Sequence, residues 1–221
     1  MEYKVAVIIP TLNEEKFIAR CLDSVIEQSY PFRDMDVMVV DGGSNDRTRE
    51  IVEEYGRKYI NIRFIHNPGR IQSIAFNIGV DNSDAPYIVR LDAHALYNKD
   101  YIEKCIAGLQ NDTQIGNVGG RCKILPFNDT LWANTNAILN YSRFGIGGSA
   151  FRVGVKPDFV DSVPFGAFPR TVFEKVGGMR EDLPRAEDNE YNSRIRKAGY
   201  KVFFNPEIVS SYYARPTLKA S

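Results

Sequence analysis

Three short acidic segments of this sequence carry residue types that could do chemistry. Asp41 follows an apolar run and precedes two glycines, Asp92 and His94 are separated by one residue, and residues 187–190 read Glu-Asp-Asn-Glu. Carboxylates in such settings can bind a nucleotide base, hold a divalent cation or take a proton from an attacking hydroxyl. Each segment also has a purely structural interpretation, which the residues alone leave open.

Asp41 is the candidate for recognising a base. A carboxylate at the end of a strand can accept the ring N–H of a pyrimidine or guanine, and Gly42 and Gly43 would let the backbone approach the ligand. The alternative is an Asx-type turn, or a cap for a helix that opens at Asp46. Neither the dinucleotide fingerprint G-x-G-x-x-G nor the P-loop pattern occurs in the chain, which excludes phosphate-binding loops of those two kinds.

Asp92 and His94 are the candidates for binding a metal ion. If residues 92–94 are extended, both side chains point to the same side, because side chains alternate along a strand. A carboxylate and an imidazole can share one divalent cation, and the histidine favours manganese over magnesium, which prefers oxygen ligands. The alternative is an aspartate in a surface turn beside a histidine that is hydrogen-bonded to the backbone.

Asp188 is the candidate for proton transfer. A carboxylate at this point, aimed into a cleft, could act as a general base toward an attacking hydroxyl. Acidic residues also suit a helix N-terminus for electrostatic reasons alone. Arg194 and Arg196 follow on the same helix, where a solvated face or a salt bridge back to Glu190 is expected.

An alternation of apolar strands and amphipathic helices must position these residues. Runs rich in β-branched residues predict strands at 5–9, 37–40, 60–65 and 87–91, followed by extended segments at 116–125 and 201–204. Helical periodicity predicts a helix capped by Asn13, one that opens at Asp46, and others at 72–80, 100–109, 171–176 and 187–197. Residues 126–170 lack a clean period, and we interpret them as loops and short elements, including a helix around 132–141, that cover a site.

The order of these elements predicts one α/β domain with a mostly parallel central sheet flanked by helices. Ligands of open α/β sheets bind beyond the carboxyl ends of the strands. We therefore expect the loops at 11–15, 41–44, 68–70 and 92–94 to cluster in space.

The composition disfavours several other classes of protein. Of the 221 residues, 43% are hydrophobic and 25% charged, which is typical of a globular protein and not of a disordered chain. Lys plus Arg equals Asp plus Glu at 28 each, so no net charge attracts nucleic acid. No apolar run approaches the roughly 18 residues of a membrane-spanning helix, and the N-terminus lacks a secretion signal. A reducing, cytosolic setting is expected from three cysteines without C-x-x-C spacing, Cys21, Cys105 and Cys122.

Five segments resemble, in their order along the chain, the motifs of the family 2 glycosyltransferases with a GT-A fold. They are residues 9–15, 40–48, 75–79, 91–94 and 187–199. The Asp-Ala-His variant and the ending at 212–216 resemble the bacterial and archaeal branch that builds exopolysaccharide, including succinoglycan-type glucosyltransferases. The resemblance covers nearly the whole chain and implies a nucleotide-binding half at about 1–115 and an acceptor-binding half at about 116–221, in a protein that could continue beyond residue 221.

The resemblance implies a role for each matching residue. The nucleotide would be bound by Pro10, Thr11, Asn13, Glu15, Asp41, Gly43, Arg70 and Asp92. Asp92 and His94 would hold manganese or magnesium beside the diphosphate, although His94 stands where the family has a second aspartate. The donor sugar and the acceptor would be lined by Ala93, Gly166, Arg185 and Glu187, and Asp188 matches the general base.

The implied activity is the inverting transfer of a sugar from a nucleotide-sugar, UDP-linked by preference, to a hydroxyl group in polysaccharide or glycolipid synthesis. A lipid-linked saccharide acceptor would place the protein at the cytoplasmic face of the membrane, as a peripheral protein. Two other functions stay open. A sugar-phosphate nucleotidyltransferase usually needs a basic glycine-rich N-terminal loop, where this chain has the acidic pair Glu14-Glu15. The other is a non-catalytic module that binds carbohydrate or a partner.

Overall fold

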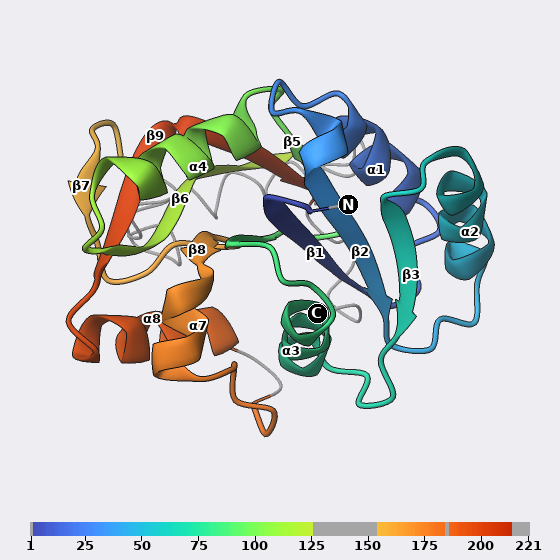
Figure 1. Cartoon of the computed structure of the whole chain (residues 1–221). Helices are drawn as coiled ribbons and strands as arrows, with labels where there is room; N and C mark the ends of the chain where they lie inside the picture. Colours follow the sequence, from blue (N-terminus) through green and yellow to red (C-terminus); the bar gives the residue numbers. More distant parts are fainter. Residues whose placement is uncertain (1, 126–153, 184–185, 214–221) are drawn as a thin grey trace, which may run out of the picture.

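Nine strands form one sheet in the computed structural model, which describes residues 2–125, 154–183 and 186–213 (Figure 1). Eight of them follow one another in the order β3-β2-β1-β4-β8-β6-β9-β5, and β7 pairs with β9 outside this path. The expected loops and helix at 126–153 lie outside the described residues, and so does Arg185.

The first four strands are parallel, as the sequence predicts. They are β1 (Val5–Thr11), β2 (Met35–Asp41), β3 (Ile62–His66) and β4 (Tyr87–Arg90). β1 lies between β2 and β4 and buries both of its faces. Val5, Val7 and Ile9 contact one hydrophobic core, and Ala6 and Ile8 contact the other. Burial on both faces explains why this strand reads as a continuous apolar run.

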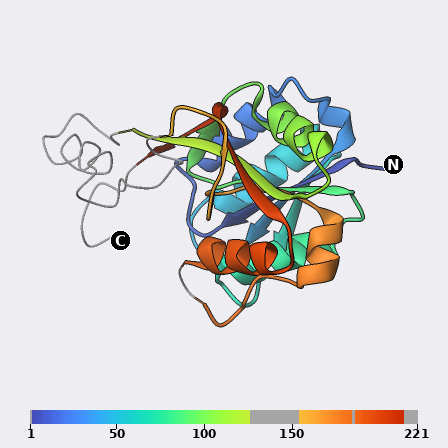
Figure 2. The same ribbon diagram turned by 90° about the vertical axis from the view of Figure 1, so that its left-hand side faces the viewer.

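Helices cover both faces of the sheet (Figures 1 and 2). The first core joins the sheet to α1 (Ile18–Ile26), α2 (Thr48–Lys58) and α4 (Tyr101–Asn111). The second core joins it to α3 (Gln72–Asp81), α7 (Arg170–Val176) and α8 (Glu187–Lys197). A short 3-10 helix, Phe32–Asp34, precedes β2. In the part of the chain that the structure describes, no helix has the length and apolar character needed to cross a bilayer.

The other half of the sheet mixes strand directions. The long strands β6 (Ile115–Leu125) and β9 (Lys201–Tyr213) are parallel to each other. The short strands β5 (Ala95–Tyr97), β7 (Asp158–Phe159) and β8 (Ala167–Pro169) pair antiparallel with their neighbours. The sequence does not predict these three strands, because two or three residues carry too little periodicity. The mostly parallel sheet flanked by helices is nevertheless the architecture that the sequence indicates.

The strand β9 runs beyond its predicted end at residue 204. The register with β6 shifts between Gly120 and Arg121, so that Gly120 faces Asn205 and Arg121 faces Val209. Residues 206–208 have no partner in this pairing. The gap accommodates Pro206, which has no N–H to donate to the ladder.

Two local expectations are wrong. Asn13 does not cap α1, which begins at Ile18, because the Asn13 backbone is left-handed (φ 56°) and its side chain binds the loop after β2. Residues 92–94 form a turn, closed by a hydrogen bond from the Ala95 N–H to the Asp92 carbonyl (3.2 Å), and not an extended segment. In both places hydrogen bonds to distant segments accompany the change, joining Asn13 to the loop after β2, Asp92 to Cys21 and His94 to Glu14.

Candidate active site

The candidate residues gather at the carboxyl edge of the parallel strands. β1, β2 and β4 lie side by side and end at Thr11, Asp41 and Arg90. The Gly42 N–H donates to the Thr11 carbonyl (2.8 Å), and the Arg90 N–H donates to the Gly166 carbonyl (3.0 Å). The predicted clustering of the loops is therefore confirmed, and the segment before β8 joins them.

A buried arginine lies at the centre of the charged groups at this edge. The Arg90 side chain is 4% exposed, and its guanidinium donates to Gln72 Oε1 (3.0 Å), Glu187 Oε1 (3.0 Å) and Asp188 Oδ1. These contacts join β4 to the first turns of α3 and α8. The sequence prediction omitted both Arg90 and Gln72. A signal for Arg90 was present, since a charged residue in an otherwise apolar strand, two positions before Asp92, needs a buried partner.

Asp188 combines access with an unusual proton affinity. Its side chain keeps 28% of its surface exposed, so a substrate hydroxyl can reach it. Burial raises the pKa of Asp188 to about 6, against the opposing charge of Arg90 and with smaller contributions from the negative charges of Glu187 and Asp92. The carboxylate is thus ionised at neutral pH and more basic than an ordinary aspartate, as a general base requires.

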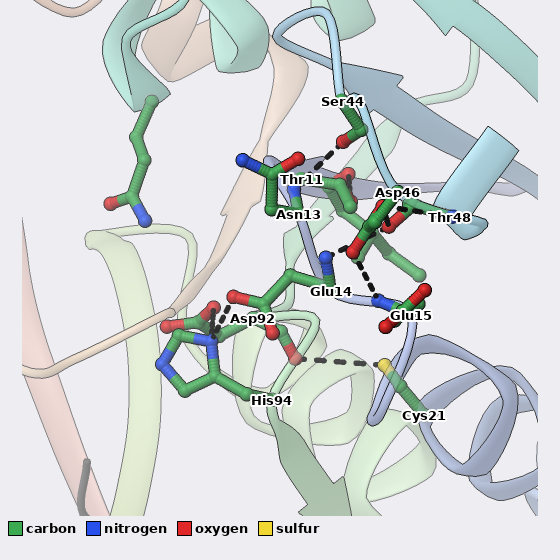
Figure 3. A network of polar contacts seen from close by, with 12 residues as sticks. Thr11, Asn13, Glu14, Glu15, Cys21, Ser44, Asp46, Thr48, Asp92 and His94 are labelled. Carbon is green, nitrogen blue, oxygen red and sulfur yellow. Dashed lines mark hydrogen bonds and ion pairs between the residues drawn. The ribbon is translucent and has the colours of Figure 1, made fainter. Parts of the chain in front are cut away.

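His94 lies between two carboxylates. Its Nδ1 is 2.9 Å from Glu14 Oε1 and 3.2 Å from Asp92 Oδ1, and its side chain is 8% exposed (Figure 3). Asp92 and His94 therefore do meet, although through a turn and not through an extended segment. Glu14 belongs to the segment that resembles the family motif, but the sequence prediction gave it no role.

A divalent cation is the cofactor that the sequence resemblance implies. Asp92 and His94 offer an oxygen and a nitrogen that face each other, a donor set that manganese accepts. Among the described residues, no group of three or more His, Cys, Asp or Glu side chains is arranged to hold a metal ion. The residues present fit a cation that takes two ligands from the protein and the others from a diphosphate and water.

The backbone of Asp92 is held from two sides. The Cys21 thiol donates to the Asp92 carbonyl (3.5 Å), and the Tyr97 hydroxyl accepts from the Asp92 N–H (2.5 Å). Burial, followed by the charge of Asp92, raises the pKa of Cys21 far above its usual value, so the thiol stays protonated and can donate. These contacts restrict the position of the Asp92 carboxylate.

A set of hydrogen bonds ties the loop after β1 to the loop after β2 (Figure 3). The backbone N–H groups of residues 13–15 donate to Ser44 Oγ (2.7 Å), Thr48 Oγ1 (2.8 Å) and Asp46 Oδ2 (3.1 Å). In return, the side chains of Asn13 and Glu15 accept from backbone N–H groups of residues 45 and 47. Both expected nucleotide ligands therefore already hold the loops together.

The Asp46 carboxylate accepts three hydrogen bonds, one from the Glu15 backbone in the other loop and two from Thr48 in its own loop, and its removal gives a testable change. Although burial acts to raise the pKa of Asp46, hydrogen bonds from Thr48 and the Glu15 backbone hold it below its usual value. Asp46→Ala is expected to reduce the free energy of unfolding by about 1–3 kcal/mol at neutral pH. The lowered pKa means that this stabilisation is present above the unfolded pKa and is lost as the pH falls through the folded pKa.

Urea unfolding of Asp46→Ala at pH 7 and in acid measures this contribution. Glu50→Ala is the matched control, because Glu50 lies in the first turn of α2, shortly after Asp46, and its exposed carboxylate pairs with the exposed Arg47 (2.9 Å). Equal stability of the two variants would contradict the role given to Asp46.

Asp41 adopts the turn that was the structural alternative for it. Its carboxylate accepts from the N–H groups of Gly43 (2.9 Å) and Ser44 (2.8 Å) and from the Ser44 hydroxyl (2.5 Å). The residue is only 2% exposed. A carboxylate has about four lone-pair positions, so these three bonds leave one acceptor position for a ligand.

The other expected ligands of the nucleotide lie in the same loops. The Thr11 hydroxyl donates to the Ile9 carbonyl (3.0 Å), and Pro10 lies beside Val40 in the sheet. Arg70 follows β3 and has a left-handed backbone (φ 65°) that packs 3.2 Å from where a Cβ on Gly42 would stand. A side chain at position 42 would push these two loops apart.

Backbone strain is concentrated at this edge. The non-glycine residues with positive φ in the described ranges are Asn13, Arg70, Phe165 and Ala186. Each lies in a loop of the site: the last two directly precede Gly166 and Glu187, both of which bond to Arg90. Residues with such strained backbones persist where the surroundings hold them, and they are frequent at functional sites.

Ala93 was expected to line the sugar, and in the structure its side chain is buried.

Comparisons with known proteins agree with this geometry. The model of the family described as glycosyl transferase family 2 matches residues 6–177. A Methanococcus voltae protein is 31% identical over 97% of this chain and carries the name dolichyl N-acetyl-alpha-D-glucosaminyl phosphate 3-beta-D-2,3-diacetamido-2,3-dideoxy-beta-D-glucuronosyltransferase. The succinoglycan biosynthesis protein ExoA of Rhizobium meliloti is 30% identical over 96% of it. The chain spans 68% and 64% of the lengths of these two relatives.

A solved structure extends the likeness to the fold. The mannosyltransferase PcManGT from Pyrobaculum calidifontis, in complex with GDP-Man and Mn²⁺, superposes with a TM-score of 0.74 and 24% identity. The superposition covers 99% of this chain and 59% of that one. The GT-A fold is therefore the architecture of this chain.

Proposed function

This chain belongs to glycosyl transferase family 2 and is a glycosyltransferase, and from that premise we propose that it transfers a sugar with inversion from a nucleoside diphosphate sugar to a hydroxyl acceptor. Asp188 is the general base of the proposed reaction. The observation that carries the proposal is the carboxylate of Asp188, which is partly exposed, has a raised pKa, and is held by Arg90 at the strand edge where Asp92 also lies.

The proposed chemistry is a single displacement. Asp188 takes the proton of the acceptor hydroxyl while that oxygen attacks the anomeric carbon, and the bond from this carbon to the diphosphate oxygen breaks. The nucleoside diphosphate leaves from the opposite face, so the configuration inverts. Glu187 precedes the base in the chain, and Gly166 bonds to the backbone of Arg90, whose side chain holds the base. Together with Ala93 and Arg185, they are the residues that the sequence resemblance assigns to the sugar and the acceptor.

The nucleotide would lie over the loops after the first three strands. Asp41 uses its remaining acceptor position for the base N–H, and the strained Arg70 lies along the nucleotide. Pro10, Thr11, Asn13, Glu15 and Gly43 shape this surface mainly through their backbone, since several of their side chains are engaged in loop contacts. Residues 1–115 would form this half, and residues 116–221 the acceptor half.

Asp92 and His94 would hold a divalent cation, manganese in preference to magnesium. When bound, this ion offsets the charge that develops on the departing diphosphate. The protein residues contribute the position of the two ligands, which Cys21, Tyr97 and Glu14 restrict.

A lipid-linked saccharide is the acceptor class we propose, which would confine the reaction to the cytoplasmic face of a membrane. The name of the Methanococcus voltae relative includes a dolichyl sugar phosphate. UDP is the donor nucleotide favoured by the sequence resemblance, and GDP is the nucleotide of the sugar in the Pyrobaculum calidifontis structure.

Thermal-shift and transfer assays test the function. UDP-, GDP- and dTDP-sugars are added with and without Mn²⁺, and a donor that raises the melting temperature is then offered to acceptors while nucleoside diphosphate release is followed. We expect stabilisation by one nucleotide class, larger with Mn²⁺. Pyrophosphate release from an NTP and a sugar phosphate would instead support a nucleotidyltransferase. Absence of any response to sugar nucleotides would support a binding module.

The pH dependence of transfer is a separate expectation. Because the free enzyme must carry an ionised Asp188, kcat/KM should rise with pH up to the pKa of about 6 and then level off. This rising part is the acidic limb of the pH profile, and initial rates from about pH 5 to about pH 8 at subsaturating acceptor measure it. A limb near the ordinary aspartate value, about 4, would contradict the raised pKa.

A further inference from the structure

We propose that Arg90 is a positioning residue for the transfer reaction, which holds the general base and sets its charge without contacting the substrate. The inference rests on the proposed function of Asp188. Its basis is geometric: one buried guanidinium joins the end of β4 to side chains from the first turns of two helices.

The planar guanidinium suits this task because it presents several donors in a fixed arrangement. The terminal nitrogen Nη1 donates to Asp188, and Nη2 donates to both Glu187 and Gln72. The backbone N–H of the same residue donates to Gly166. Arg90 thereby holds the start of α8 against β4, α3 and the segment before β8. Lysine has one ammonium group and cannot reproduce these contacts together.

Arg90 also supplies the positive charge beside two neighbouring carboxylates. The charged and titratable groups that act on Asp188 are Arg90 and Asp92 from the β4 segment, Glu187 from its own helix, and Tyr101 from α4. Of these, Arg90 is the one cation. The side chains of Arg90 and Glu187 are 4% and 12% exposed, so water screens this interaction weakly. Without the guanidinium, no positive charge of these protein groups would oppose the burial of Asp188 and the negative charge of Glu187.

The first test is the pH profile of transfer in three variants of the full chain. Arg90→Met should lower kcat at pH 7 by about 10²-fold and move the acidic limb upward by roughly 1–3 pH units. Arg90→Lys should restore the limb toward that of the wild type, because the charge returns, while kcat stays reduced. Gln72→Met is the matched control: it removes a neutral partner of the same guanidinium, so the limb should not move.

The second test separates positioning from a general structural role. In an Asp188→Asn background, Arg90→Met should cause little further loss of kcat/KM, because the residue through which Arg90 acts is already gone. Equal losses in both backgrounds would overturn the proposal. The Kd for the donor nucleotide should stay within about two-fold of the wild type, since Arg90 is assigned no contact with it.

A third variant keeps the proposal testable if Arg90→Met does not fold. Glu187→Gln removes a negative neighbour of Asp188, so the acidic limb should move to lower pH, opposite to the effect of Arg90→Met. If Asp188→Asn retains transfer, the assignment of the base fails together with the role of Arg90. A different result separates the two assignments. If Asp188→Asn is inactive, the base assignment stands, and the role of Arg90 is wrong if Arg90→Lys has wild-type kcat or if Glu187→Gln leaves the acidic limb in place.

Discussion

Asp188→Asn should lower kcat/KM for sugar transfer by about 10²- to 10⁴-fold and leave the Kd of the donor nucleotide nearly unchanged. The substitution keeps the shape of the side chain and its hydrogen bond to Arg90, but an amide cannot take a proton from the acceptor. The measurement is steady-state transfer at pH 7.5 together with calorimetric nucleotide binding. A rate within a few-fold of the wild type would exclude Asp188 as the base.

Glu190→Gln is the matched control for that experiment. Glu190 lies in the first turn of the same helix, but its carboxylate pairs with Arg194 at 2.7 Å, which is one of the two uses that the sequence left open for Arg194, and not with Arg90. Arg196, for which the same pairing was considered, lies 2.7 Å from Asp161 instead. Glu190→Gln should therefore leave the rate of transfer unchanged, although it also removes an acidic residue from the start of α8.

Asp188→Asn also has an expected effect on the free energy of unfolding. The folded pKa of Asp188 lies above its unfolded value, so the wild type loses stability as the pH rises from about 4 to about 6, and the loss is constant above that range. An asparagine does not titrate. Asp188→Asn should therefore be as stable as the wild type in acid and more stable at pH 8, by at most about 3 kcal/mol. Urea unfolding of both proteins at the two pH values measures the difference. The expectation is contradicted if, at pH 8, the variant is less stable than the wild type.

Gly166→Ala is expected to have the largest effect on folding among the site substitutions. Gly166 has φ of 75°, and a Cβ there would stand 2.4 Å from Asn117 Oδ1. Asn117 is 1% exposed and its Nδ2 donates to Asn192 Oδ1 (2.6 Å), so it cannot move away easily. Left-handed strain and the overlap together should cost about 2–5 kcal/mol, which corresponds to a fall in Tm of roughly 5–15 °C for a domain of this size.

Gly199→Ala is the control for Gly166→Ala. Gly199 also has a positive φ (91°), but no atom lies within 4 Å of the position that its Cβ would take. It therefore reports the backbone cost alone, about 1–2 kcal/mol. Calorimetric unfolding of both variants isolates the contribution of the Asn117 contact, and equal Tm values would show that the site tolerates a methyl group.

Much of the architecture could be predicted because it depends on local pattern. The neighbouring strands β1 and β2 are largely apolar and buried throughout, and β1 shows the reason, since Val7 and Ile8 face opposite cores. Parallel strands share a carboxyl edge, so the predicted clustering of loops followed from strand order alone. α8 begins and ends where its acidic start and its period place it.

Other features were decided by contacts between segments that are distant in the sequence. Asn13 and residues 92–94 form hydrogen bonds with segments distant in the sequence, so their local spacing misled. The sequence left open whether Asp41 forms its own turn, and only the folded loop shows that it does, with three hydrogen bonds that leave one acceptor position.

The charge cluster is the clearest case. Arg90 meets Glu187 and Asp188 across separations of 97 and 98 residues, and no local periodicity encodes such a meeting. The residue types and their places at strand and helix ends came from the sequence. Which carboxylate is paired, how deeply it is buried and therefore how strongly it holds a proton depend on the surroundings that β4, α3 and α8 create only when they pack together.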